Sequence, residues 1–187
     1  MKYNVHKNCK GVYNFIMIDR VLIDSLNLKS RDFAVRWKDQ IRDLPKLKHF
    51  HKMDDETLID IAKSIFPLLA RTLDRGFDLS LIGDLFIKFG KTRMHSEFPV
   101  SEVIFGLYVA QKVVIEYITT EFAPESPMRM YQSLGALTKV AEFFLLGSFY
   151  VTKGFLEETY TNMSSKDKVS EELLKKYFKE DFFFKDS

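Results

Sequence analysis

The pattern of apolar positions is densest in residues 96–117, which we interpret as one helix near the centre of the fold. Apolar residues recur there at intervals of three and four, the spacing that places side chains on one face of a helix. Val109 and Val113 widen that face toward the opposite side. A helix that is apolar over most of its circumference is typical of the middle of a bundle. The stretch therefore predicts a core helix with partners on several sides.

Other stretches of the chain show the same periodicity on one face only. Polar and turn-forming residues separate these stretches, which marks them as different helices. The segment 123–127, with its two prolines, is the clearest break in the pattern. We expect further helices over residues 15–28, 30–44, 55–73, 79–95 and 128–163.

Residues with special backbone or capping properties indicate where these helices begin and end. Gly76 is placed to let the chain turn after the third helix. Pro67 lies inside the pattern of that helix, and we expect it to kink the helix or remove one hydrogen bond, at a cost of about 3 kcal/mol. The candidates for caps at helix starts are Ser30 or Asp32, Asp54 or Asp55, and Asp78.

The predicted fold is all-α, a globin-like bundle of about six helices with a long C-terminal helix. Five prolines and eight glycines among 187 residues leave long stretches free of both, which favours helices over a many-stranded sheet. We expect one domain over residues 1–163 and a C-terminal extension over residues 164–187. The long helix exceeds what a compact bundle needs, so it either breaks near Gly147 or Gly154 or pairs with a second subunit.

Composition and charge narrow the classes of partner. The chain carries 28 basic and 26 acidic residues, for a formal net charge of +2. This balance gives no electrostatic reason to expect nucleic acid or an anionic membrane as a partner. Cys9 is the single cysteine, which fits a reducing compartment, and the longest apolar runs are too interrupted to span a bilayer. We therefore expect a cytoplasmic protein without a membrane segment.

The chain has four histidines, a residue type that commonly binds a metal or haem. His49 and His51 lie in the basic linker 46–52, where neighbouring lysines disfavour a cation and no carboxylate or cysteine completes a ligand set. His95 lies in the last turn of a predicted helix, where a histidine more often faces water and interacts with the helix dipole. We expect no metal and no cofactor, and His95 stays a candidate ligand only for the alternative function below.

No constellation in the sequence predicts catalysis. Adjacent carboxylates occur at residues 54–56, 157–158 and 171–172, but neighbouring residues on a helix diverge by about 100° and do not converge on one substrate atom. No nucleophile elbow, zinc-binding helix, phosphate-binding glycine loop or C-x-x-C motif occurs. We therefore predict that the protein is not an enzyme.

Eighteen phenylalanines give two possible readings. Phe86, Phe89 and Phe105, together with His95, could line a cavity for an apolar ligand. Packing in the core and in a subunit interface is the ordinary use of such residues. Adjacent aromatic residues on the long helix point about 100° apart, so one of them is expected to contact a second subunit. The predicted interface residues are Phe143, Phe144, Val151 and Phe155.

Three stretches carry a resemblance to a known family. They are LKSRDFAVRWKDQI at residues 28–41, the capped helix 55–73, and the helix start FPVSEVI at residues 98–104. This arrangement resembles the N-terminal domain of RsbR-type stressosome proteins and related input domains of histidine kinases and transcription regulators, over residues 19–122 and onward to 163. The resemblance implies a globin-like fold that binds no haem, dimerises and acts as a sensory module. In that family the module is usually joined to an effector such as a STAS domain, for which residues 164–187 are too few.

Together these observations predict a non-catalytic cytoplasmic signalling module, combining sensory input and homodimerisation. It would act by protein–protein interaction, with an unspecified signalling protein as partner, in bacterial stress or two-component-type signalling. The alternative is a sensor that binds a small molecule, either an apolar ligand or haem.

Overall fold

The computed structural model describes residues 20–121 and 126–164, and within them every regular element is a helix. The predicted all-α class is therefore confirmed. Seven labelled helices follow a helical segment at residues 20–28, where about six helices were expected in all. The polar arm, Cys9, the start of the first helix and residues 165–187 of the extension lie outside the described residues. The helices are α2 (Ser30–Arg42), α3 (Lys48–His51), α4 (Asp55–Lys63), α5 (Ile65–Arg75), α6 (Leu79–His95), α7 (Val100–Glu121) and α8 (Pro127–Ser164).

The two additional helices have different origins: one predicted helix is divided in two, and one predicted linker is helical. The predicted helix 55–73 is divided into α4 and α5 at Ser64, which is the C-cap of the first and the N-cap of the second. Pro67 is thus in the first turn of α5, where its missing N–H has no partner to lose. The division lies three residues before Pro67, and Ser64 keeps a helical φ of −74° and ψ of −25°, which fits the expectation that Pro67 interrupts the predicted helix. The basic linker forms the short helix α3.

Two of the three predicted side-chain caps are confirmed. The Asp54 carboxylate accepts a hydrogen bond from the backbone N–H of Thr57, and the Asp78 carboxylate accepts one from the N–H of Leu81. Gly76 ends α5 with a φ of 89°, the left-handed region that favours glycine. A side-chain cap on α2 is absent, because its N-cap residue is Lys29 and the chain continues almost directly from the preceding helical segment.

Helix α7 is the core helix that the sequence indicates. It packs against α2, α6 and α8, and Val109 and Val113 are both buried. The Trp37 indole N–H of α2 donates a hydrogen bond to the backbone carbonyl of Gly106 at 2.8 Å. Gly106 also leaves room for the Phe50 ring of α3, which a Cβ there would meet at 3.0 Å. Helices α2 and α7 are therefore fixed to each other by both packing and a buried hydrogen bond.

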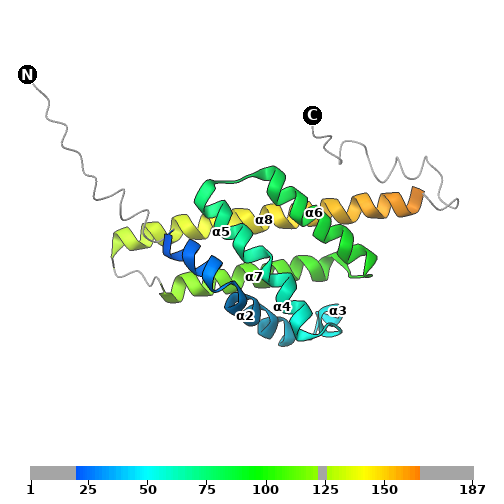
Figure 1. Cartoon of the computed structure of the whole chain (residues 1–187), viewed down its shortest axis with the longest axis horizontal. Helices are drawn as coiled ribbons and strands as arrows, with labels where there is room; N and C mark the ends of the chain where they lie inside the picture. The colour runs from blue at the N-terminus through cyan, green and yellow to red at the C-terminus, as the bar shows by residue number, and fades with distance from the viewer. Residues whose placement is uncertain (1–19, 122–125, 165–187) are drawn as a thin grey trace, which may run out of the picture.

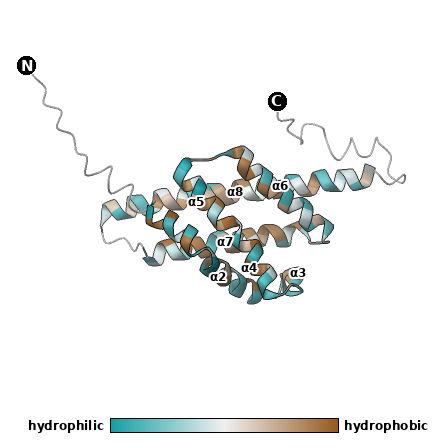
Figure 2. Cartoon of the chain, viewed as in Figure 1, coloured by the Kyte–Doolittle hydropathy of each residue, from teal (hydrophilic) through white to brown (hydrophobic). Residues whose placement is uncertain are grey.

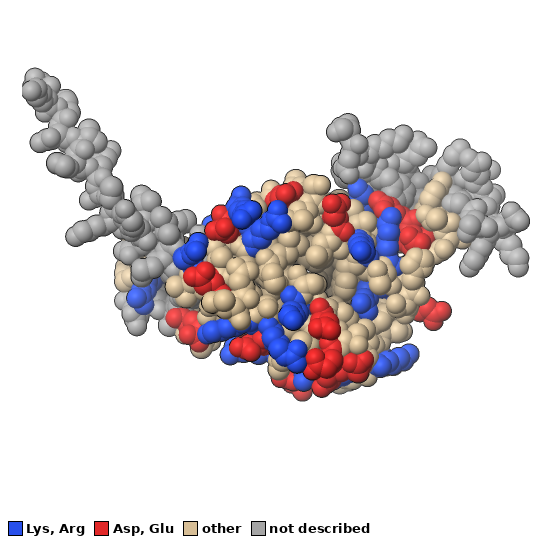
Figure 3. Space-filling model, viewed as in Figure 1, with Lys and Arg blue, Asp and Glu red and all other residues tan. Residues whose placement is uncertain are grey.

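The helices form two crossing layers. Figure 1 shows α7 and α8 running across the molecule in opposite directions, with α4, α5 and α6 crossing them and α2 at the lower edge beside α7. Figure 2 shows hydrophobic residues gathered along the middle of α7, where the other layer crosses it. The space-filling view in Figure 3 shows acidic and basic side chains interspersed over the face of the molecule turned to the viewer.

Four glycines set the close crossing of α6 and α8. A Cβ on Gly90 would overlap the backbone carbonyl of Val151, and one on Gly154 would overlap the carbonyl of Ile87. Gly83 and Gly147 face the rings of Tyr150 and Phe86. Helix α8 does not break at Gly147 or Gly154, so the first of the two predicted possibilities is wrong. Because these glycines have no side chain, the backbones of α6 and α8 can approach each other closely.

Two helices are long and apolar enough to cross a membrane by length and composition alone. They are α7, in which half of the apolar segment is buried in the fold, and α8, in which a third is buried. Length and composition alone do not decide between a membrane span and a core helix, so the expectation that the apolar runs are too interrupted to span a bilayer stays a prediction. The burial of α7 against three helices is typical of the core helix of a globular domain.

Candidate functional site on the outward face of helix α8

The outward side of α8 carries an uncharged stripe that no described helix covers. Its residues recur at alternating intervals of four and three, the spacing by which two helices pack along a common seam. Leu134 is 51% exposed and Leu145 is 72% exposed. We call this set the α8 stripe, and its members are Leu134, Thr138, Ala141, Leu145, Ser148 and Thr152.

The hydroxyl groups of the α8 stripe add little polarity to it. Thr138 donates to the carbonyl of Leu134, Ser148 donates to that of Phe144, and Thr152 donates to that of Ser148, at 2.8–2.9 Å. Each hydroxyl proton is thus used within the helix itself. The outer side of the stripe presents methyl groups and small side chains between two leucines.

A groove of about 490 Å³ lies along the second half of the stripe. It is lined by Leu145, Leu146, Phe149 and the stripe residues that follow, and Lys153 closes one side. The Lys153 side chain is 10% exposed, with its Nζ 4.0 Å from the carboxylate of Glu157. The groove thus combines an apolar lining with a single buried ammonium group.

The opposite side of α8 is buried in the bundle. Ala136, Val140 and Val151 are all fully buried there. Helix α8 packs most extensively against α6 and also against α7, so two of its sides are covered. The helix is therefore held with the α8 stripe turned away from the core.

The predicted interface residues lie on the covered sides. Phe143 and Phe144 are 0% and 2% exposed, and Val151 and Phe155 are also buried within the chain. The Phe143 ring packs edge-on against Phe86 of α6, with ring centroids 5.6 Å apart. Both adjacent phenylalanines fit into one chain because α8 has a helix on each of two sides. The prediction that one of them contacts a second subunit is therefore wrong.

The structure does not bring the four predicted ligand-binding residues together. The Phe86 side chain is fully buried in packing, and Phe89 lies under the guanidinium of Arg93. Phe105 is partly exposed and packs against Tyr108 on the outside of α7. His95 lies at the surface, where its Nε2 is 3.0 Å from the carboxylate of Glu158.

The linker histidines, His49 half-buried and His51 exposed, contact other parts of the chain. His49 Nδ1 lies 2.8 Å from one Glu102 oxygen, and the His49 backbone N–H donates to the other at 3.0 Å. His51 Nε2 lies 3.1 Å from the carbonyl of Ile41. Glu102 at the start of α7 thus binds the start of α3, although His51 and the linker lysines are exposed. Among the described residues, no three His, Cys, Asp or Glu side chains are grouped closely enough to hold a metal ion.

Arg93 is one of four described groups with a perturbed pKa, together with Lys38, Asp54 and Asp55. Burial lowers the pKa of its guanidinium, which lies between the rings of Phe89 and Phe98 at 5.1 and 5.3 Å. The group donates to the Met53 sulfur at 3.8 Å. Stacking on two aromatic faces is a common way to hold an arginine in a partly buried position.

Comparison with known proteins leaves the identity of the chain open. No family model, no curated protein and no solved structure matches it. The likeness to RsbR-type domains therefore stays a prediction that rests on the sequence alone. The function must be argued from the surface that the fold presents.

Proposed function

We propose that the chain is a non-catalytic, cytoplasmic signalling module that forms a homodimer through the α8 stripe and acts by binding other proteins. The observation that carries the proposal is the exposure of Leu134 and Leu145 within an uncharged stripe. Exposed apolar side chains in a continuous row are typical of an interaction surface.

A second copy of the chain is the occupant that the stripe fits best. The six stripe residues are uncharged, so two identical stripes meet without repulsion between their own members. The charges beside the stripe are Glu142, which is exposed, and Lys153, whose Nζ lies 4.0 Å from the Glu157 carboxylate of the same chain. Intervals of four and three are those by which the knobs of one helix fill the holes of another. Small residues between the leucines permit two helix backbones to approach closely. A two-fold dimer uses the same patch on both chains, as this arrangement requires.

Features that carried the family resemblance also support a globin-like sensory module of the stress or two-component type. Trp37 of α2 packs edge-on against Phe50, and Phe50 packs edge-on against Phe98, with centroids 5.7 and 5.0 Å apart. These contacts join the tryptophan-containing helix to the start of α7. Trp37 and Phe98, which belong to the stretches of the resemblance, are thus connected through Phe50, which lies outside them, while the sensory role stays a proposal.

The molar mass of the full chain in solution tests this function. Light scattering at micromolar concentration is expected to give twice the 21.9 kDa of one chain. A mass of one chain across the micromolar range would overturn the homodimer and the role of the α8 stripe.

A further inference from the structure

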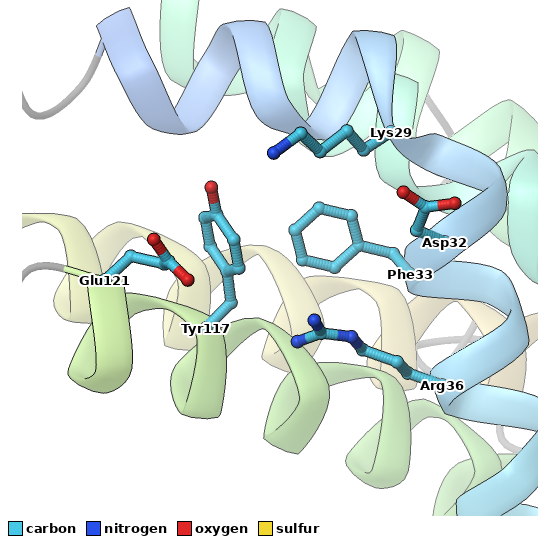
Figure 4. Close-up of a pocket in the computed structure, with 6 residues that line it drawn as sticks. All are labelled: Lys29, Asp32, Phe33, Arg36, Tyr117 and Glu121. Atoms are coloured by element: carbon cyan, nitrogen blue, oxygen red, sulfur yellow. The ribbon is translucent and has the colours of Figure 1, made fainter.

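A second feature, a cleft of about 110 Å³ between α2 and the last turns of α7, is independent of the α8 stripe. Figure 4 shows the six side chains that line it, four from α2 or its N-cap and two from α7. The α2 members recur at intervals of three and four, which places them on one face of the helix. The lining residues are Lys29, Asp32, Phe33, Arg36, Tyr117 and Glu121.

Two aromatic rings form the base of the cleft. Phe33 and Tyr117 are buried and pack edge to face, with centroids 5.0 Å apart. The Tyr117 hydroxyl is 2.8 Å from the Ser25 hydroxyl, which fixes the ring from behind. The base is therefore rigid and offers an apolar surface for an aliphatic group.

Four charged side chains surround these rings. Figure 4 shows the Lys29 ammonium and the Arg36 guanidinium on opposite sides of the ring pair, and the Glu121 carboxylate beside Tyr117. Asp32 supplies the second carboxylate. The rim thus carries two positive and two negative groups around one small space.

The cations of the rim differ from the other cations of α2. Arg31 binds the Glu56 carboxylate at 2.9 Å, and Arg42 binds the Asp55 carboxylate at 2.7 Å. Lys29 and Arg36 make no such ion pair with any described residue. Arg31 and Arg42 are therefore neutralised by carboxylates outside the cleft, whereas Lys29 and Arg36 are available to a ligand in it.

We propose that this cleft binds a small zwitterion of the size of a free amino acid. Its carboxylate would lie between Lys29 and Arg36, and its ammonium group would lie at Glu121, over the Tyr117 ring. A simple anion would also meet the two carboxylates, and a simple cation would meet the two basic groups. A ligand with both charges contacts rim groups of both signs. The cleft volume of about 110 Å³ limits the ligand to a small amino acid.

Titration of the full chain with small probes tests the proposal. The probes are glycine, L-alanine and L-serine, with acetate and methylammonium as probes that carry one charge each. At least one amino acid is expected to bind about tenfold more tightly than either single-charge probe, since each carries only half of the charged contacts. Binding of none of the three amino acids, or equally tight binding of acetate, would overturn the zwitterion site.

Variants locate the binding in the cleft. Arg36→Gln and Glu121→Gln are each expected to weaken the binding of the amino acid by about tenfold. Arg31→Gln is the matched control, because Arg31 is on the same helix, is exposed and pairs outside the cleft. Thermal unfolding of each variant verifies that it folds. Equal weakening in Arg31→Gln, or unchanged binding in both cleft variants, would contradict the assignment.

Discussion

Gly90 of α6 lies directly against the backbone carbonyl of Val151 in α8, with no room for a Cβ between them. Gly154 of α8 has the same relationship to the carbonyl of Ile87. The crossing of the two helices is therefore set by backbone contact at two points, together with the packing of the Phe86 and Tyr150 rings on the other two glycines. Since α8 carries the exposed stripe on its other side, this contact also fixes where the stripe lies.

Gly90→Ala is expected to lower the free energy of unfolding by about 1–2 kcal/mol, because the overlap forces the helices apart. Alanine would by itself favour the helix by about 1 kcal/mol, so the sign of the change is informative. Denaturant unfolding measures it, with Ser80→Ala, an exposed site on α6, as the control. A Gly90→Ala variant more stable than the wild type would show that the helices are not in contact there.

Val109→Asp is expected to prevent folding. Val109 is 1% exposed in the middle of α7, and a carboxylate at that position would have no partner. Circular dichroism with denaturant is expected to show no cooperative transition. Ser101→Asp is the control, because it adds the same charge at an exposed position in the first turn of α7. Near-native stability of Val109→Asp would mean that α7 is not the core helix.

The cap at Asp54 predicts how stability depends on pH. Hydrogen bonds from the Thr57 hydroxyl and backbone N–H hold the pKa of the Asp54 carboxyl below its ordinary value of 3.8. The capping carboxylate therefore stabilises the fold above that value, and this contribution is lost as the pH falls through the lower pKa of the folded state. Asp54→Asn keeps a capping oxygen that does not titrate, so its stability is expected to fall less below about pH 4. Identical acid unfolding curves for the two proteins would contradict this role of Asp54.

Phe143→Ala is expected to destabilise the fold without weakening the dimer. The Phe143 side chain is fully buried against Phe86, and removing a buried phenylalanine costs about 3–5 kcal/mol. Unfolding and molar mass are measured on the same sample, under conditions where the variant remains folded. If the variant is monomeric but has unchanged stability, Phe143 is a residue of the subunit interface and not of the core.

Local signals in the sequence were enough for several elements. Helix α7 follows from its apolar periodicity, and the caps at Asp54 and Asp78 follow from residue type and position. Gly76 ends α5 because the left-handed backbone there favours glycine. In each case the residues that determine the structure lie within a few positions of it.

Features that depend on tertiary placement were missed or misjudged. Pro67 indicated an interruption, but its position at Ser64 was missed because the apolar pattern continues through it. Helix α3 depends on Glu102, which lies far along the chain. The α8 stripe was not recognised because threonine, alanine and serine separate its leucines. The cleft beside Tyr117 consists of surface charges that become a site only when α2 and α7 meet.

The affinity of the homodimer in two matched leucine variants tests the central claim most directly. Leu145 and Leu28 are 72% and 85% exposed, so glutamate at either position is compatible with the fold, but only Leu145 belongs to the α8 stripe. Analytical ultracentrifugation over a concentration series gives the dissociation constant of each. Leu145→Glu is expected to weaken the dimer by about 30-fold or more, since it places a charge from each chain in the interface, whereas Leu28→Glu leaves the wild-type value. Equal dissociation constants for the two variants would contradict dimerisation through α8.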